Sequence, residues 1–143
     1  MCKWLKQTKG GIGFLFLRLA LGITFTAHGA GKLFGAFGGP GVQGFAGLLQ
    51  QIGVPYPQLS AYLAGGAEFF GGILLILGLF TRLASVFLLI TMLVAIFKVH
   101  LSHGLFMQNG GFEYPFVISG ALLLLLIEGA GCCSMDQKCA NKA

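Results

Sequence analysis

Apolar residues along this chain gather in four long segments, which are separated by short polar or glycine-rich stretches. The segments cover about residues 12–34, 59–80, 83–101 and 114–130. A helix needs roughly 20 apolar residues to cross the hydrocarbon core of a bilayer, and each segment is close to that length. The pattern therefore predicts an all-α polytopic membrane protein, a four-transmembrane-helix bundle that forms a single membrane domain over residues 1–143.

The connections between the segments differ in length. Only Thr81 and Arg82 separate the second segment from the third, which predicts a tight turn between two antiparallel neighbouring helices. The connection after the first segment carries apolar residues at helical spacing, namely Val42, Phe45, Leu49 and Ile52. We expect a short interfacial helix there, and a cysteine-containing tail over residues 131–143.

Composition supports a bilayer as the surroundings of the chain. Hydrophobic residues make up 56% of it and charged residues 9%, and its mean hydropathy is +0.86, which is far outside the range of soluble domains. The net charge of +5 comes from scattered basic residues, with no basic stripe interleaved with aromatic residues. We therefore expect the lipid bilayer as a partner and no nucleic acid.

The distribution of basic residues predicts the orientation. On the side of the two termini lie Lys3, Lys6, Lys9, Arg82, Lys138 and Lys142, whereas the opposite side holds Lys32 and Lys98. An excess of basic residues in short loops marks the cytoplasmic face. We expect a multi-pass protein of the cytoplasmic (inner) membrane with both termini in the cytoplasm.

Glu68 lies near the middle of the second apolar segment. An ionised side chain there costs about 3 kcal/mol or more unless it is protonated, paired or hydrated, so this carboxylate needs a partner. His28 and Lys32 are spaced four residues apart in the outer half of the first segment and would lie on one helix face. The sequence therefore predicts a buried His/Lys/Glu cluster between the first two helices.

More polar residues fall at the same outer level of the membrane. Lys98 and His100 close the third segment, while Glu113 and Tyr114 open the fourth. Ionisable groups inside a membrane are candidates for a functional site, although a structural ion-pair network would give the same pattern. From these residues we select Glu68, His28, Lys32 and Glu113 as catalytic candidates.

Arg18 and Glu128 form a second candidate pair, at the inner ends of the first and fourth helices. Both side chains are long enough to reach the inner interface, which favours a structural role for this pair.

The cysteines and histidines do not form a recognised metal or redox motif. Cys2, Cys132, Cys133 and Cys139 all fall on the predicted cytoplasmic side, where thiols stay reduced, and none forms a CxxC pair. The Cys-Cys-x5-Cys spacing of the tail matches no standard metal site, and His28, His100 and His103 are too loosely arranged for metal or haem. We predict free thiols and no metal site.

Several motifs, taken in order, resemble a known family. They are Arg18 to Gly22, His28-Gly29, Lys32-Leu-Phe, Glu68 with Gly71-Gly72, Leu77 to Arg82, Gly110 to Pro115, Gly129-Ala-Gly131 and Ser134-Met-Asp136. Together they resemble the DoxX family of small bacterial and archaeal integral membrane proteins, over nearly the whole chain. The resemblance implies a four-helix membrane bundle. It assigns no agreed catalytic roles to the matching polar residues His28, Lys32, Glu68, Arg82 and Glu113, and the cysteine-rich tail is not part of the family pattern.

Named members of that family include a small subunit of an archaeal thiosulfate:quinone oxidoreductase and a membrane component of a mycobacterial redox-stress assembly. The first hypothesis is therefore a membrane subunit that supports quinone-linked or thiol-linked redox chemistry. A quinone would be the cofactor, bound by His28, Lys32, His100 and Tyr114, while Glu68 and Glu113 relay protons. A soluble or membrane oxidoreductase partner would supply the electrons, and whether this chain is itself an enzyme stays open.

The second hypothesis is a small-molecule or proton-coupled membrane carrier, or a non-catalytic membrane scaffold, in which Glu68 gates a path or only forms an ion pair. Four helices without an internal repeat are few for a monomeric carrier. A carrier would therefore be expected to form a homo-oligomer.

Overall fold

A computed structural model describes residues 10–140 of the protein. Four long helices form a bundle: α2 (Ile12–Phe34), α4 (Pro57–Leu77), α5 (Thr81–Ala95) and α6 (Glu113–Glu128). Shorter elements are η1 (Ala36–Gly38), α3 (Gly41–Gln51), the π-helical η2 (Ile96–His100), η3 (Leu101–His103), η4 (Met107–Asn109) and α7 (Met135–Ala140). The predictions for Cys2, Lys3, Lys6, Lys9 and Lys142 fall outside the described residues.

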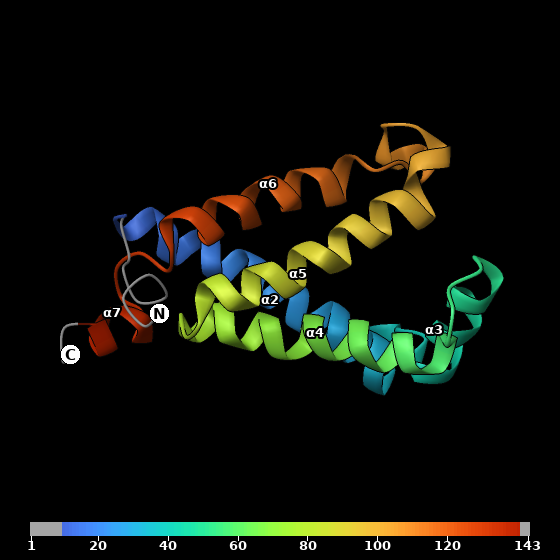
Figure 1. Ribbon diagram of the computed structural model, residues 1–143, viewed down its shortest axis with the longest axis horizontal. Helices are drawn as coiled ribbons and strands as arrows, with labels where there is room; N and C mark the ends of the chain where they lie inside the picture. Colours follow the sequence, from blue (N-terminus) through green and yellow to red (C-terminus); the bar gives the residue numbers. More distant parts are fainter. Residues whose placement is uncertain (1–9, 141–143) are drawn as a thin grey trace.

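The four long helices run alternately up and down (Figure 1). The start of α2, the connection between α4 and α5, the end of α6 and the short α7 all lie at one end of the bundle, which we call the turn end. The opposite end, the loop end, holds α3 and the segment that joins α5 to α6. This alternation agrees with the order predicted from the connections.

Three helical stretches are long and apolar enough to cross a membrane: Ile12–Phe34, Pro57–Leu77 and Thr81–His103. The fourth helix, α6, has 16 residues. At about 1.5 Å per residue it is about 24 Å long, which is less than the roughly 30 Å of a hydrocarbon core. The structure therefore supports an all-helical membrane protein with three spans of full length, and α6 is shorter than the predicted segment.

The turn between α4 and α5 does not lie where the sequence predicted it. α4 ends at Leu77, and the chain reverses at Gly78 and Phe80, whose φ angles of 64° and 48° are in the left-handed region. Thr81 and Arg82 are the first residues of α5. The prediction that these two residues form the turn is wrong, because a glycine that tolerates positive φ ends the preceding helix three residues earlier.

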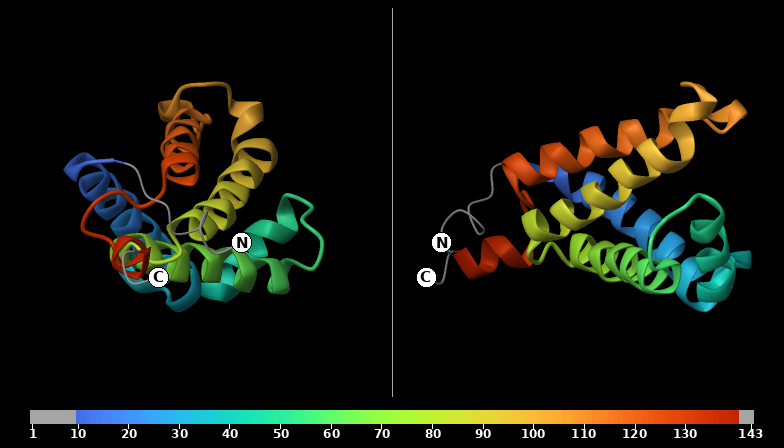
Figure 2. Two further views of the ribbon diagram at one scale, coloured as in Figure 1. Left: turned by 60° about the vertical axis from the view of Figure 1, so that its left-hand side comes forward. Right: turned by 45° about the vertical axis from the view of Figure 1, so that its right-hand side comes forward.

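All four long helices contribute to one buried apolar cluster. It contains Leu21 and Phe25 of α2, Leu75 of α4, Ala84, Leu88 and Met92 of α5, and Ile118, Leu122 and Leu125 of α6. Figure 2 shows that α5 and α6 cross above the α2–α4 pair and spread apart from it toward the loop end. The cluster joins the two helix pairs.

α2 and α4 approach closely because glycines line their contact. A Cβ atom added at Gly29 would lie 2.3 Å from the backbone nitrogen of Phe69, and one added at Gly72 would lie 2.5 Å from the Thr26 hydroxyl. Such distances are far below van der Waals contact, so only glycine fits at these positions. This close approach brings the α2 face that carries Lys32 against α4.

At the turn end, Arg18 is fully buried, with no exposed side-chain area. Its guanidinium donates hydrogen bonds to the carbonyl oxygens of Leu75 at 3.2 Å, Cys132 at 3.3 Å and Cys133 at 3.1 Å. Arg18 thus ties the last turn of α4 to the segment after α6, and its partners are these carbonyls instead of Glu128. The predicted Arg18–Glu128 pair at the interface is therefore corrected, because unpaired carbonyls at the end of a helix attract a cation.

Asp136 supplies the matching cap at the start of α5. Its carboxylate oxygens accept hydrogen bonds from the backbone N–H groups of Phe80 at 2.8 Å and Thr81 at 3.0 Å. The carboxylate is only 4% exposed and meets the positive end of the α5 dipole. Ser134 directly precedes α7, and its hydroxyl accepts a hydrogen bond from the Gln137 N–H at 3.2 Å, which caps the short helix that carries Asp136. The predicted tail is thus packed into the bundle through residue 136.

Candidate functional site

Lys32 and Glu68 form a close ion pair between α2 and α4. The Lys32 Nζ atom lies 2.6 Å from Glu68 Oε1, with 2% of the Glu68 side chain and 25% of the Lys32 side chain exposed. Gly65, one turn before Glu68, leaves room for α2, since a Cβ there would lie 2.9 Å from the Leu33 side chain. The pairing predicted from the cost of a buried carboxylate is therefore present in the structure.

The second carboxylate oxygen of Glu68, Oε2, differs from Oε1 in its surroundings. Oε2 is buried and has no hydrogen-bond partner within the described residues. A buried polar atom left unsatisfied costs about 1–3 kcal/mol, and more when it is charged. Glu68 lines a cavity of about 710 Å³, so this carboxylate with one unsatisfied oxygen belongs to the wall of a cavity.

This cavity, which we call the Glu68 cavity, lies between α3, α4, α5 and the π-helical segment. Its walls are mainly apolar, with Leu63, Ala64, Phe87, Ile90 and Val94 among the lining residues. The polar groups on the walls are few: Lys32, Gln51, Ser60, Glu68, Thr91 and His100. A mainly apolar pocket with a few convergent polar groups is typical of a small-molecule site.

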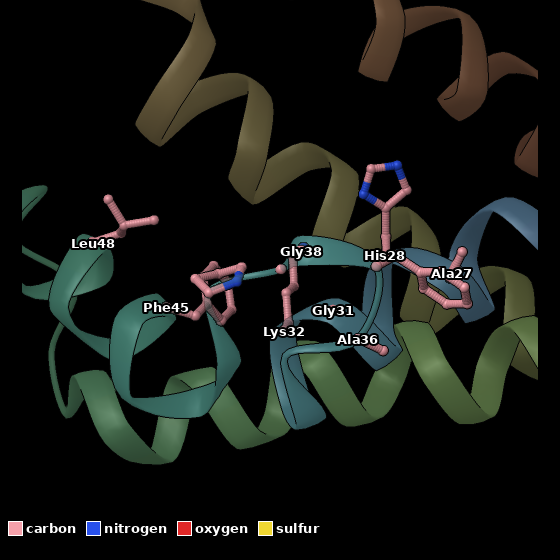
Figure 3. A pocket seen from close by; sticks show the side chains of 11 residues that line it. Ala27, His28, Gly31, Lys32, Ala36, Gly38, Phe45 and Leu48 are labelled. Carbon is pink, nitrogen blue, oxygen red and sulfur yellow. The ribbon is translucent and has the colours of Figure 1, made fainter.

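A second hollow of about 450 Å³, the His28 hollow, lies on the other side of Lys32. It is lined by residues of α2, of the glycine-rich segment 36–39 and of α3. Figure 3 shows the His28 imidazole extending away from Phe45, whereas the Lys32 ammonium lies against the Phe45 ring. The distance from Lys32 Nζ to the centre of that ring is 4.9 Å, a cation–π contact.

His100 reaches the Glu68 cavity from the π-helical segment. Its Nδ1 atom lies 2.6 Å from the carbonyl oxygen of Gly110. A carbonyl can only accept a hydrogen bond, so Nδ1 carries the proton and Nε2 holds a lone pair in the neutral ring. Short π-helical turns occur frequently at functional sites, and here the turn carries a histidine with a fixed tautomer.

The DoxX family matches residues 13–101 of the chain. This chain belongs to the DoxX family. The matched region contains α2, α3, α4 and α5, and with them Lys32, Glu68 and both hollows. The resemblance seen in the sequence is thereby confirmed, and the cysteine-containing segment after α6 lies outside the matched residues.

Relatives of this DoxX chain extend over most of its length. A Bacillus subtilis protein named "Putative oxidoreductase CatD" is 35% identical over 115 residues, which cover 80% of this chain and 78% of the relative. The Escherichia coli inner membrane protein YphA is 35% identical over 118 residues, covering 74% and 81%. A Haemophilus influenzae protein of unknown role is 36% identical, covering 89% and 90%. No solved structure matches the chain significantly.

Two of the predicted site residues of the DoxX chain lie away from both hollows. Glu113 is exposed, and its Oε2 atom accepts a hydrogen bond from the Met107 N–H at 3.1 Å. Tyr114 is 40% exposed at the start of α6. Neither residue lines the Glu68 cavity or the His28 hollow. Glu113 instead closes the loop that connects α5 to α6.

The predicted group of six or more polar residues is therefore divided. Lys32, Glu68 and His100 surround the Glu68 cavity, while the exposed His28 lines only the other hollow. His103, one turn beyond His100, is exposed and bonds the Val99 carbonyl at 3.0 Å through its Nδ1 atom. Among residues 10–140, no three His, Cys, Asp or Glu side chains are grouped closely enough to hold a metal ion.

Thr91 and Phe45 are two site residues that the sequence analysis did not select. Thr91 lines the Glu68 cavity, and Phe45 borders both hollows. Thr91 could have been noticed as a hydroxyl within an apolar helix. Phe45 was assigned to the apolar face of a short helix, and no sequence signal distinguishes a ring that contacts a lysine from one that contacts lipid.

Proposed function

We propose that this DoxX protein binds a quinone in the Glu68 cavity and serves quinone-linked redox chemistry as a membrane subunit. The observation that carries the proposal is a buried carboxylate on the wall of a cavity of about 710 Å³ with mainly apolar walls: Glu68, whose Oε2 atom has no hydrogen-bond partner among residues 10–140. A quinone has polar oxygens on a ring and an apolar tail, which matches this division of polar and apolar surface. The volume falls in the range of about 300–1,000 Å³ that is usual for small-molecule sites.

The walls of the cavity supply the contacts that a quinone headgroup needs. The Lys32 ammonium lines the cavity and is a hydrogen-bond donor for a quinone oxygen. The Thr91 hydroxyl also lines it, but its proton is donated to the Leu88 carbonyl oxygen at 2.7 Å. Leu63, Phe87 and Ile90 line it as well, and they are 65%, 52% and 52% exposed on the outer surface of the bundle. A ligand dissolved in the bilayer therefore has an apolar path into the cavity from the side.

The proton acceptors for quinol oxidation are also present. A quinol releases two electrons and two protons when it becomes a quinone. In the proposed reaction, Glu68 Oε2 accepts one proton and His100 Nε2 accepts the other, since both atoms have free lone pairs. The two electrons pass to an oxidoreductase partner that carries a redox cofactor, in keeping with the oxidoreductase name of the B. subtilis relative.

The thiol-linked form of the hypothesis has less support. Cys132 and Cys133 lie at the turn end, where Arg18 binds their carbonyl oxygens, whereas the Glu68 cavity includes α3 and η2 at the loop end. Cys132 and Cys133 therefore do not share a site with the Glu68 carboxylate.

Bound quinone tests the proposal. After purification in a mild detergent, organic extraction and chromatography should recover quinone from the wild-type protein. Glu68→Gln replaces a proton acceptor with an amide and is expected to lower bound quinone roughly tenfold, equivalent to about 1.4 kcal/mol of binding free energy. Glu113→Gln makes the same chemical change outside the cavity and should retain the quinone. Wild-type protein that is folded and does not bind added quinone would refute the proposal.

We also propose that α6 completes a fourth span and that α3 lies at the membrane interface. The outward side chains Phe116, Val117 and Ile127 of α6 are 62%, 66% and 65% exposed, and lipid would cover them. A local thinning of the bilayer, or residues that flank the helix, would compensate for its short length. Four spans would put both termini on one side, and the basic residues favour the cytoplasm.

Thiol labelling tests this orientation. A membrane-impermeant maleimide should label Cys133 and Cys139, which are exposed, in inverted membrane vesicles and not in intact cells. Cys132 should react more slowly, because partial burial and the neighbouring Cys133 thiol raise its pKa and so reduce its thiolate fraction at neutral pH. Efficient labelling from outside intact cells would reverse the proposed topology.

A further inference from the structure

The two hollows are separated by a wall of three side chains. Lys32, Phe45 and Leu48 line the Glu68 cavity and also the His28 hollow. Within this wall, Lys32 is held by two contacts, one to Glu68 at 2.6 Å and one to the Phe45 ring at 4.9 Å. The position of Lys32 in the wall thus depends on its ion pair with Glu68, which lines the Glu68 cavity.

The His28 hollow differs in character from the Glu68 cavity. Segment 36–39 contributes Ala36, Phe37 and two glycines to its lining, and His28 stands exposed at its side (Figure 3). Its volume of about 450 Å³ has room for about 15 water molecules at roughly 30 Å³ each. Water in this hollow would meet the His28 imidazole and the Lys32 ammonium, which are the polar side chains of its lining, whereas the larger Glu68 cavity has room for an apolar ligand.

Few charged or titratable groups surround the Lys32–Glu68 pair. α2 contributes His28 and Lys32, α4 contributes Glu68, and His100 comes from the π-helical segment. Tyr114, at the start of α6, lines neither hollow. α3 carries no ionisable residue. Lys32 is thus the cation in contact with Glu68, and its position depends on the charge of that carboxylate.

We propose that the His28 hollow is the aqueous route by which protons exchange with Glu68, and that Lys32 closes this route while Glu68 is ionised. When Glu68 gains a proton it becomes a neutral acid, and the ion pair that holds Lys32 is lost. Lys32 then swings away and joins the two hollows. Water in the joined space accepts the proton and transfers it to the His28 imidazole or to bulk water. Glu68 becomes a carboxylate again and the ion pair closes the route.

This inference rests on the proposed function in one respect: the proton that Glu68 accepts comes from a quinol. The route itself follows from the two hollows, from the wall between them and from the ion pair. Access of water-soluble molecules to the cavity can therefore be measured without any quinone.

A cysteine placed in the Glu68 cavity tests the route. Thr91 lines only that cavity, so Thr91→Cys places a thiol there. The substitution is made in a variant in which all four native cysteines have been replaced by serine. The protein is reconstituted in vesicles with 2-sulfonatoethyl methanethiosulfonate on both sides. Lys32→Ala or Glu68→Gln, which removes the ion pair, should accelerate modification roughly tenfold, and Lys32→Arg should leave it slow. Equal rates with and without the ion pair would overturn the proposal.

Two further variants separate the route from general loosening of the protein. Leu122→Cys places the thiol in the buried core, away from both hollows, and should stay unreactive in every background of a folded protein. Ala27→Leu fills the His28 hollow and should slow the reaction again in the Lys32→Ala background. If the variant with both Lys32→Ala and Ala27→Leu still reacts fast, the methanethiosulfonate enters from the lipid side, and the route is refuted.

Quinone content measured on the same samples keeps the two proposals apart. Ion-pair-dependent access in a protein that binds no quinone would support the route and refute the proposed ligand. Bound quinone, together with a rate of thiol modification that does not change when Lys32 is replaced, would support the proposed ligand and refute the route.

Discussion

Replacing Lys32 with methionine is expected to lower the free energy of unfolding by about 3 kcal/mol. The change removes the cation of a pair whose carboxylate is only 2% exposed, so Glu68 stays buried without its partner. Breaking a buried ion pair from one side typically costs about 3–5 kcal/mol. We choose the lower value because a quarter of the Lys32 side chain is exposed and screened by solvent.

Thermal or denaturant unfolding of the reconstituted protein measures this loss. Lys32→Met combined with Glu68→Leu should recover stability to within about 1 kcal/mol of wild type, because no buried charge is left unpaired. Lys98→Met is the matched control, since Lys98 is exposed on the π-helical segment, and it should change stability by no more than about 0.5 kcal/mol. A Lys32→Met protein as stable as Lys98→Met would mean that the ion pair contributes nothing.

Replacing Gly29 with alanine is expected to destabilise the protein by about 2–3 kcal/mol, because a single methyl group must fit where two helix backbones meet. The new Cβ would lie 2.3 Å from the Phe69 backbone nitrogen, and backbone cannot move aside as the end of a flexible side chain can. α2 and α4 would have to separate, and this would also disturb the Lys32–Glu68 contact one helical turn away.

Gly66→Ala is the control for this prediction. Gly66 is also a glycine within a helix of the same pair, but a Cβ atom there meets nothing within 4 Å. Alanine at that position should be neutral or stabilise the helix by about 0.5–1 kcal/mol, since glycine is the poorer helix former. Equal unfolding temperatures for Gly29→Ala and Gly66→Ala would show that the close approach of α2 and α4 is not required.

The sequence predicted the features that follow from apolar length and from the cost of buried charge. The four helices lie near their predicted positions because long apolar runs leave few alternatives in a membrane. Lys32 and Glu68 were paired correctly because a carboxylate in an apolar helix needs a cation, and Lys32 was a basic residue at the matching depth.

The position of His28 relative to Lys32 could not be derived from spacing alone. Residues four apart share a helix face, and this led us to place both side chains in one site. In the structure, the Lys32 side chain lies in the wall between two hollows, so His28 lines one hollow and Glu68 the other. The helical repeat predicts a shared face, but it does not predict where α3 packs across that face.

The partners of Arg18 left no sequence signal. Its hydrogen bonds go to backbone carbonyls, which every residue has, so a search for a complementary side chain led to Glu128 instead. The sequence predicted His100 as a site residue, but it did not predict the π-helical turn that carries this histidine. A π turn adds one residue to the helix and has no distinctive sequence pattern. The aspartate that caps α5 was likewise hidden in a segment interpreted as a tail.

The packing of Arg18 and Asp136 has a consequence for how the protein is made. Translation runs from the N-terminus, so Arg18 and the ends of α4 and α5 are synthesised long before the residues that complete their hydrogen bonds. Until residues 132–136 leave the ribosome, the start of α5 lacks its acidic cap and Arg18 lacks two of its carbonyl partners. A nascent or truncated chain that lacks residues 132–136 therefore leaves a buried arginine short of carbonyl partners and a helix end without its cap, so the turn end is completed only when synthesis is nearly finished.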